Sequence, residues 1–488
     1  MKRTLLVFLL IHMILSACAP ASKPTPTPAP SATPLSTVTI TPTSTAIPSA
    51  TPTPIPTIQV GDLTVPDPRV TNPELFDLQN PKAPIPQFVN AMNMGGINLT
   101  PEQVANGITY EEHKDKDGNL FAVGIYNLDS DPSKTGEILE GSIPLFITQK
   151  NESGEWLWKN DQKYLLDKSN LYLGVSVEDR THNELDIIKT SFNMAFVGYD
   201  TNWNNTEPTE GQIIYDYKYA HADRNVKWAV NNSLRVSAGP LFFVDTYPRW
   251  IKDGNFTKDQ LEQIIVRRIT TLMEHYKDQI EVWTVLNEYF PNQWSGVPYD
   301  VIQNKVGYDR YLELVYTTAQ TVNPDAILIY NAGRNHTQSE SDRTNGINYQ
   351  HTIETIKKLK NMGIKNLAVG LQMHIDAKNP PSKETLIKTM ISYGVPVYIT
   401  ELDVNLENID PKNPNRLIIQ ADIYKEILEA AIESGVCDSI TIFQILDKYS
   451  WLETDSGKIN ADPTPFNDSG NPKPAYYAIL QAILEFIK

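Results

Sequence analysis

Two glutamates stand at the ends of apolar, strand-like runs in this sequence. Glu288 follows Val282–Leu286 and Asn287, and Glu401 directly follows Val395–Thr400. If both runs are strands of one parallel barrel, their carboxyl ends meet at the same mouth, so the two carboxylates can flank one bond. Cleavage of a glycosidic bond needs such a pair, one carboxylic acid to protonate the leaving oxygen and one carboxylate to attack the anomeric carbon. Carboxyl groups about 5–5.5 Å apart would make the reaction a retaining double displacement.

Other polar and aromatic side chains follow the same or neighbouring runs. Asn287, beside Glu288, is placed to hydrogen-bond a sugar 2-hydroxyl group. Gln372 and His374 end another apolar run and could hold Glu401, with Asp403 orienting His374, while Trp451 offers a flat face on which a sugar ring can stack. Taken singly, each has a structural alternative, because a strand-end glutamate is often a surface residue and a lone histidine is usually a satisfied imidazole. No third metal ligand accompanies His374, so we expect neither a metal nor an organic cofactor.

The elements that position these residues follow a regular alternation. Eight β-branched apolar runs are separated by helical stretches, which predicts an α/β protein with a (β/α)₈ TIM barrel over residues 161–488. The runs are Leu171–Val177, Ala195–Tyr199, Leu234–Val244, Val282–Leu286, Ala326–Tyr330, Leu367–His374, Val395–Thr400 and Ser439–Ile445. The helical stretches include Lys258–Tyr276, Asp309–Thr321, Tyr349–Met362, Lys383–Tyr393 and Arg416–Ser434.

Residues 58–160 predict a small β-rich accessory region in front of the barrel. Three short strands are expected, at Asn119–Leu128, Ile143–Lys150 and Glu155–Lys159, separated by turn residues. The pattern leaves open whether this region binds sugar, packs against the barrel or does neither.

The N-terminus has the composition of a leader and a linker. Residues 1–17 combine a short basic start with an apolar run too short to span a bilayer, which is typical of a secretory signal peptide. The run ends in Leu-Ser-Ala-Cys, which predicts lipid attachment at Cys18, although a chance cysteine behind an ordinary signal is the alternative. Residues 18–57 are rich in Pro, Thr and Ser and predict an extended, disordered linker. We therefore expect an exported protein, lipid-anchored to the bacterial cell membrane or surface.

The net charge of the protein limits the classes of molecule that we expect it to bind. The 488 residues carry a formal net charge of -16, and residues 1–57 contribute only three charged groups, all basic. Such an acidic body repels nucleic acid and anionic lipid surfaces, so we expect no nucleic acid partner and membrane contact only through the anchor on Cys18. With Cys18 lipidated, Cys437 is the one remaining thiol and is expected to be a buried structural residue. We expect a monomer that acts on a polysaccharide.

Residues 161–488 resemble glycoside hydrolase family 10, the retaining endo-β-1,4-xylanases. Asn331 after the fifth strand and a set of short segments carry the resemblance in the expected order. These segments are Trp283–Glu288, Gln372–His374, Ile399–Asp403, Asp447–Trp451 and Pro472–Tyr477. The resemblance implies Glu288 as the acid/base and Glu401 as the nucleophile, with Asn331 and Asp403 in support.

The sequence departs from the family on strands two, three and eight. The family's Glu-Asn-x-x-Lys-Trp reads Gly198–Trp203 here, so the Asn and Lys that grip the sugar before the cleaved bond are absent and Trp203 is kept as a sugar-binding residue. The histidines and tryptophan after strand three are missing from Ala238–Val244. Phe443-Gln444 replaces Trp-Gly on strand eight, and Thr284 replaces Asp. Candidate substitutes for the family's missing polar groups are Asp200, Asn202, Asp245 and Gln444.

Three functions are compatible with this pattern. The first is a retaining glycoside hydrolase that cleaves internal β-1,4 linkages of xylan or a related β-glycan. The second is a glycosidase on the same barrel with a different polysaccharide substrate. The third is a catalytically weak surface lipoprotein that captures glycans; the pair Glu288 and Glu401 speaks against it, since a binder needs no positioned carboxylates.

Overall fold

The computed structural model describes residues 54–128, 141–178, 180–217, 220–294, 298–333, 346–454, 457 and 460–487. The predicted signal peptide 1–17, the predicted lipidation site Cys18 and all but the last residues of the predicted linker 18–57 lie outside the described residues. Residues Ile55–Lys488 form one compact unit. Among the described residues, none of the helices combines the length and the apolar character that crossing a bilayer requires.

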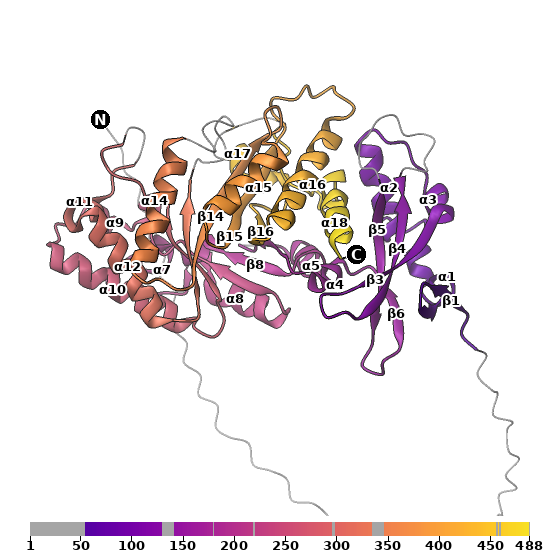
Figure 1. The fold of residues 1–488 in the computed structure, drawn as a ribbon, viewed down its shortest axis with the longest axis horizontal. Coiled ribbons are helices and arrows are strands. Elements are labelled where there is room, and N and C mark those ends of the chain that lie inside the picture. The colour runs from indigo at the N-terminus through magenta and orange to yellow at the C-terminus, as the bar shows by residue number, and fades with distance from the viewer. Residues whose placement is uncertain are drawn as a thin grey trace, which may run out of the picture. The chain divides into compact units, whose positions relative to one another are not determined.

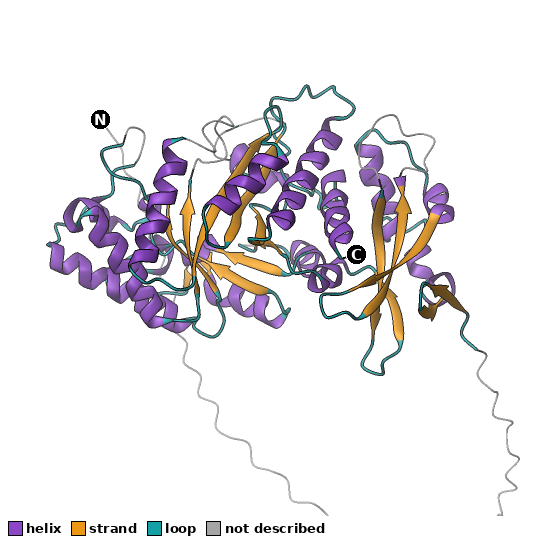
Figure 2. Cartoon of the chain, viewed as in Figure 1, coloured by secondary structure: helices purple, strands orange, loops and turns teal. Residues whose placement is uncertain are grey.

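Eight parallel strands close into a barrel in the order β11-β12-β13-β14-β15-β16-β7-β8. Figures 1 and 2 show barrel strands with helices packed around them. The strands are β7 (Tyr172–Ser176), β8 (Met194–Val197), β11 (Arg235–Ala238), β12 (Val282–Asn287), β13 (Ile327–Ala332), β14 (Leu367–Asp376), β15 (Val397–Asn405) and β16 (Cys437–Ile442). Each lies on one of the eight predicted runs, and pairing of β16 with β7 closes the sheet. The TIM barrel prediction is confirmed.

Helices surround the barrel strands and begin where their sequences provide caps. In both α5 and α10 an N-terminal threonine forms a capping box, Thr181 with Glu184 and Thr257 with Gln260. The longer helices are α5 (His182–Ser191), α8 (Ala222–Asn231), α10 (Lys258–His275), α12 (Tyr308–Val322), α14 (Ile347–Asn361), α15 (Lys383–Ser392), α16 (Arg416–Ser434) and α18 (Pro474–Phe486). Shorter elements are α6 (Gly198–Thr201), α7 (Trp203–Thr206), η3 (Val244–Thr246), α9 (Arg249–Lys252), α11 (Val301–Val306), η4 (Asp447–Tyr449), α17 (Trp451–Thr454) and the hairpin β9 (Asp216–Tyr217) with β10 (Ala220–His221).

The region before the barrel contains an antiparallel sheet of four strands, in the order β3-β4-β5-β6. The three predicted strands correspond to β4 (Leu120–Asn127), β5 (Ser142–Lys150) and β6 (Trp156–Lys159). Strand β3 (Ile108–Lys114) was not predicted, because its sequence ITYEEHK carries mostly polar residues. The remaining elements are β1 (Thr57–Val60), β2 (Leu63–Pro66), α1 (Pro68–Thr71), η1 (Pro73–Phe76), α2 (Pro84–Met94), α3 (Pro101–Gly107) and α4 (Gln162–Lys168).

Helix α18 joins the accessory sheet to the barrel. Its residues Pro474–Leu484 are all buried, as expected of a helix that is apolar on every side. One side packs against α16 and another against β5, as Figure 1 shows, and the rings of Phe88 in α2 and Tyr477 in α18 lie 5.1 Å apart. A single hydrophobic core therefore runs through both parts, and the accessory region packs against the barrel.

Candidate active site

The carboxyl ends of the barrel strands surround a cavity of about 650 Å³, and both Glu288 and Glu401 line it. The predicted residues Asn287, Gln372 and Trp451 also line the cavity, as does Asn331. His374 and Asp403 lie behind Glu401, within contact distance of it or of one another. The fold thus brings together residues that are far apart in the sequence.

Glu401 occupies a bulged part of β15. Ile399 pairs with Leu371 and Glu401 with Gln372, so Thr400 is the extra residue of a β-bulge. The bulge lets consecutive side chains face the mouth: the Thr400 hydroxyl donates to Asn331 Oδ1 at 2.7 Å, and Asn331 Nδ2 donates to Glu401 Oε1 at 2.9 Å. Asn331 is therefore held by one residue of β15 and holds the next.

His374 supports Glu401 from the other side. Its Nε2 lies 3.2 Å from Glu401 Oε2, and its Nδ1 lies 2.8 Å from Asp403 Oδ2. Burial alone would lower the pKa of His374, but the carboxylates of Asp403 and Glu401 outweigh it and raise the pKa to about 10. At neutral pH the ring is an imidazolium that donates to both carboxylates. Trp451 Nε1 also donates to Asp403 Oδ2, at 2.9 Å, which orients the indole at the cavity wall.

Glu288 follows β12 in a strained backbone conformation, with φ +48°. Its N–H donates to the Asn331 carbonyl at 3.1 Å, and Gln372 Nε2 donates to its Oε1 at 3.1 Å. Gln372 was expected to hold Glu401; it contacts Glu288 instead, since its amide reaches past β13 to the residue that follows β12. Gly333 adjoins Glu288 so closely that a β-carbon there would lie 2.7 Å from Glu288 Cγ.

Asn287 links the supports of the two glutamates. Its Oδ1 accepts from Asn331 Nδ2 at 2.6 Å and from Gln372 Nε2 at 3.2 Å. Asn331 also contacts Glu401, and Gln372 also contacts Glu288. A continuous chain of amide hydrogen bonds therefore fixes the carboxyl group of Glu288 relative to that of Glu401.

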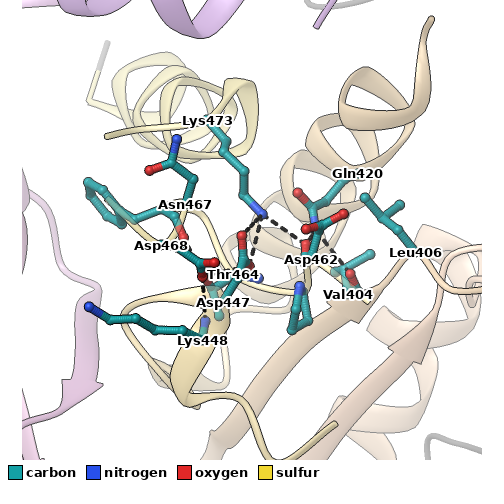
Figure 3. A network of polar contacts seen from close by, with 12 residues as sticks. Val404, Leu406, Gln420, Asp447, Lys448, Asp462, Thr464, Asn467, Asp468 and Lys473 are labelled. Carbon is teal, nitrogen blue, oxygen red and sulfur yellow. Dashed lines mark hydrogen bonds and ion pairs between the residues drawn. The ribbon is translucent and has the colours of Figure 1, made fainter. Parts of the chain in front are cut away.

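The loop after β16 carries Tyr449 and Trp451 to the site, and a buried polar network holds it (Figure 3). Lys473 Nζ lies 3.0 Å from both carboxylate oxygens of Asp447 and donates to the Asp462 carbonyl at 2.8 Å. Asp447 also accepts from the N–H and the hydroxyl of Thr464, at 2.9 and 3.0 Å. The residue just before α18 thus positions the start of the loop.

A family model described as glycosyl hydrolase family 10 matches residues 162–482. The chain belongs to this family. It is therefore a glycoside hydrolase, and the match covers the barrel and leaves the whole accessory sheet outside.

Individual family 10 proteins show how far the similarity extends. The endo-1,4-beta-xylanase B of Thermotoga neapolitana is 25% identical over 334 residues, covering 67% of this chain and 92% of that protein. The beta-1,4-xylanase of Dictyoglomus thermophilum is 28% identical over 311 residues, 61% of this chain and 83% of that one. The crystal structure of xylanase 10B from Thermotoga petrophila in complex with xylobiose has a TM-score of 0.58 at 24% identity, covering 68% of this chain and 99% of that one.

Trp203 differs from its expected role in this family 10 barrel. Its exposed fraction is 0%, and its ring packs edge-to-face against Phe242, Tyr247 and Trp250 at centroid distances of 5.3–5.7 Å. Its Nε1 donates to Glu207 Oε2 at 2.9 Å. Trp203 is a core residue beneath the strand ends, and its faces are covered by protein rather than open to a sugar.

The four candidate substitutes for the family's sugar contacts separate into two pairs. Asp200 is fully buried and accepts from Asn225 Nδ2 at 2.6 Å and from the His221 N–H at 2.9 Å, so it is a structural residue. Asp245 is exposed and does not line the cavity. Asn202 and Gln444 do line it.

Strand β7 supplies cavity residues that sequence reasoning missed. Ser176, Glu178 and Arg180 all line the cavity, and the Ser176 hydroxyl donates to Glu178. Glu178 and Arg180 follow the predicted run Leu171–Val177, a position that makes them candidates for the mouth but does not show that their side chains enter the cavity. Phe443 also lines the cavity, with its ring centroid 5.3 Å from that of His374.

The described residues include no group of three or more His, Cys, Asp or Glu side chains arranged to hold a metal ion. Cys437 lies at the opposite, amino-terminal end of β16, away from the site. The residue is half-buried rather than buried as expected, and desolvation raises the pKa of its thiol to about 12, which fits an unreactive residue.

Proposed function

We propose that this protein is a retaining endo-β-1,4-glycanase that cleaves xylan, with Glu288 as acid/base and Glu401 as nucleophile. The observation that carries the proposal is the pair of glutamates on one cavity, held relative to each other by Asn331, Asn287 and Gln372. The relatives named above are xylanases, and this chain spans 92% and 83% of two of them, which supports the same substrate class.

The reaction proceeds in two displacements. Glu401 attacks the anomeric carbon while Glu288 gives its proton to the departing oxygen, which breaks the glycosidic bond and forms a glycosyl ester on Glu401. Glu288, now a carboxylate, then takes a proton from water, whose oxygen displaces Glu401 and restores both groups. Asn331 and the His374 imidazolium hold the attacking carboxylate in place through both of its oxygens.

Asn287 is oriented to assist at the sugar. Because its Oδ1 accepts two amide hydrogen bonds, its Nδ2 is the group left to donate to a substrate hydroxyl. A donor fixed in this way can hydrogen-bond the sugar 2-hydroxyl group, a contact that strengthens in the transition state, without reorganising during the reaction.

The direct test measures hydrolysis of xylan and of an aryl β-xylobioside by the full chain. Glu401→Gln and Glu288→Gln should each lower kcat on xylan by at least about 10³-fold, because each removes one of the two essential roles. Glu433→Gln, on the outer helix α16, is the matched control and should retain full activity. Equal hydrolysis by all four proteins would show that the assignment is wrong.

Two further measurements test the stereochemistry. Proton NMR of the first product should show the β-anomer, and a 2-fluoro xylobioside should label Glu401. Release of the α-anomer would refute the double displacement. A panel of other β-glycans tests the second candidate, a different polysaccharide substrate, which the changed residues after β8, β11 and β16 favour. Faster cleavage of one of these glycans would show that it, and not xylan, is the substrate.

We also propose that the protein works outside the cytoplasm, tethered by a lipid on Cys18. The support is the basic start, the apolar run and the Leu-Ser-Ala-Cys sequence that follows it. Cells expressing the full chain and fed a radiolabelled fatty acid should incorporate label into the wild type and none into Cys18→Ala. Equal labelling, or labelling of neither, would refute the anchor.

A further inference from the structure

Arg180 introduces a cation into the cavity from the segment that follows β7. It follows β7, whereas the family's lysine follows strand two and is absent here. Among the described residues that line the cavity, Arg180 is the single lysine or arginine.

The guanidinium group of Arg180 is held in place, but only part of its hydrogen-bond donor capacity is occupied. Its Nη2 donates to Gln444 Oε1, and its central carbon lies 4.5 Å from the centroid of the Tyr449 ring. Its Nε is buried with no hydrogen-bond partner, and no ion pair of Arg180 is found among the described residues. A guanidinium carries five N–H donors in a fixed plane, so most of its donor capacity remains for a ligand.

The position of Arg180 indicates which part of the substrate it meets. Strand β15, which carries Glu401, pairs with β16, and β16 pairs with β7. Arg180 and its partner Gln444 therefore lie on the nucleophile's side of the mouth, whereas Glu288 lies on β12 across from them. In the proposed mechanism, the sugar that Glu401 attacks and the next sugar along the non-reducing part of the chain lie on that side.

We propose that Arg180 is a substrate-binding residue that donates hydrogen bonds to hydroxyl groups of a neutral sugar on the nucleophile's side. Gln444 and Tyr449 hold its plane against the cavity wall. A neutral sugar is the matching chemical class because Glu178, Glu288 and Glu401 line the same cavity and repel an acidic one. Arg180, in the segment after β7, takes the place of the sugar-binding lysine that the family carries after its second barrel strand. The assignment rests on the proposed glycanase function.

The test compares Arg180→Met, which keeps the length of the side chain but removes its charge and donors, with Arg180→Lys and Lys448→Met. Lys448 is the matched control, because its Nζ also lies near the Tyr449 ring, at 4.8 Å, yet it does not line the cavity. Arg180→Met should lower kcat/KM on unsubstituted xylo-oligosaccharides by about 10- to 100-fold, the range for losing hydrogen bonds from a charged donor. Arg180→Lys should recover part of the loss, and Lys448→Met should stay within about twofold of wild type at an unchanged Tm.

Three results would overturn the proposal: unchanged kcat/KM in Arg180→Met, an equal loss in Lys448→Met, or a loss confined to xylo-oligosaccharides carrying a uronic acid. Binding of xylohexaose and cellohexaose by Glu401→Gln, with and without Arg180→Met, separates this proposal from the glycanase function. If wild type hydrolyses no β-glycan while Glu401→Gln binds one through Arg180, only the glycanase function fails. If wild type hydrolyses no β-glycan and Glu401→Gln binds neither oligosaccharide, both fail.

Discussion

The buried ion pair between Lys473 and Asp447 provides a sharp test of how the loop after β16 is held. The side chains are 3% and 5% exposed, and Lys473 contacts both carboxylate oxygens at 3.0 Å. Replacing Lys473 by Met, which is apolar and of similar length, leaves the Asp447 carboxylate buried, with Thr464 as its one hydrogen-bond partner among the residues that the structure describes. Removing one partner of a buried pair costs about 3–5 kcal/mol of unfolding free energy.

The loss of unfolding free energy in Lys473→Met depends on pH, and the pKa of Asp447 sets its direction. In the wild type, burial raises the pKa of Asp447, and Lys473 and the Thr464 N–H offset this only in part. Without Lys473 the pKa rises further, so the folded state binds a proton more tightly than the unfolded state. Stability then falls as pH increases. Lys473→Met should therefore be most destabilised at pH 7–8 and less so near pH 5.

Calorimetric Tm values and urea midpoints at pH 5 and pH 7.5 provide the measurement. The neighbouring Lys448→Met is the control, since Lys448 is 41% exposed and pairs with Glu184 at 3.3 Å, so its loss should cost at most about 1 kcal/mol. Lys473→Met with Asp447→Asn should recover stability relative to Lys473→Met alone, because no charge is left unpaired. The reasoning is refuted if Lys473→Met is no less stable than Lys448→Met at pH 7.5, or if its deficit is the same at both pH values.

The other predictions concern the catalytic mouth. Gly333→Ala should lower kcat by about 10- to 100-fold by displacing the Glu288 side chain, with Tm changed by only a few degrees; steady-state kinetics beside calorimetry decides this. His374 has a folded pKa of about 10 against 6.5 when unfolded, so its stabilising contribution is complete below about pH 6.5 and lost as pH rises toward 10. Tm profiles should show a steeper alkaline decline for wild type than for His374→Gln, and parallel profiles would contradict this. Trp451→Phe keeps an aromatic face but loses the hydrogen bond to Asp403, so kcat/KM should fall about 2- to 10-fold, and an unchanged value would mean that this bond does not position the ring.

The barrel could be predicted because the same sequence pattern, an apolar strand followed by a helix, recurs along the chain. Eight apolar runs with intervening helices specify a parallel barrel, and errors at the end of one run leave the count intact. The accessory sheet was predicted only in part, since β3 has no strong apolar alternation and is completed by pairing with β4.

The active site, too, could be predicted only in part from the sequence. Glu288, Glu401, His374 and Asp403 were found because each follows or ends a strand run, and strand ends meet at one mouth. The sequence does not show which of these side chains contact one another. Gln372 contacts Glu288 rather than Glu401, because the geometry of the barrel decides which residues its amide can reach.

By itself the sequence determined the barrel, the two glutamates and their family, since strand period and strand-end residues are local properties of the chain. Only the tertiary structure decided that Trp203 belongs to the core and that Arg180 belongs to the cavity. Burial and pocket lining depend on contacts among strands distant in sequence, which residue type and spacing do not encode. The same holds for the bulge at Thr400, which turns Glu401 toward the mouth through its register with β14.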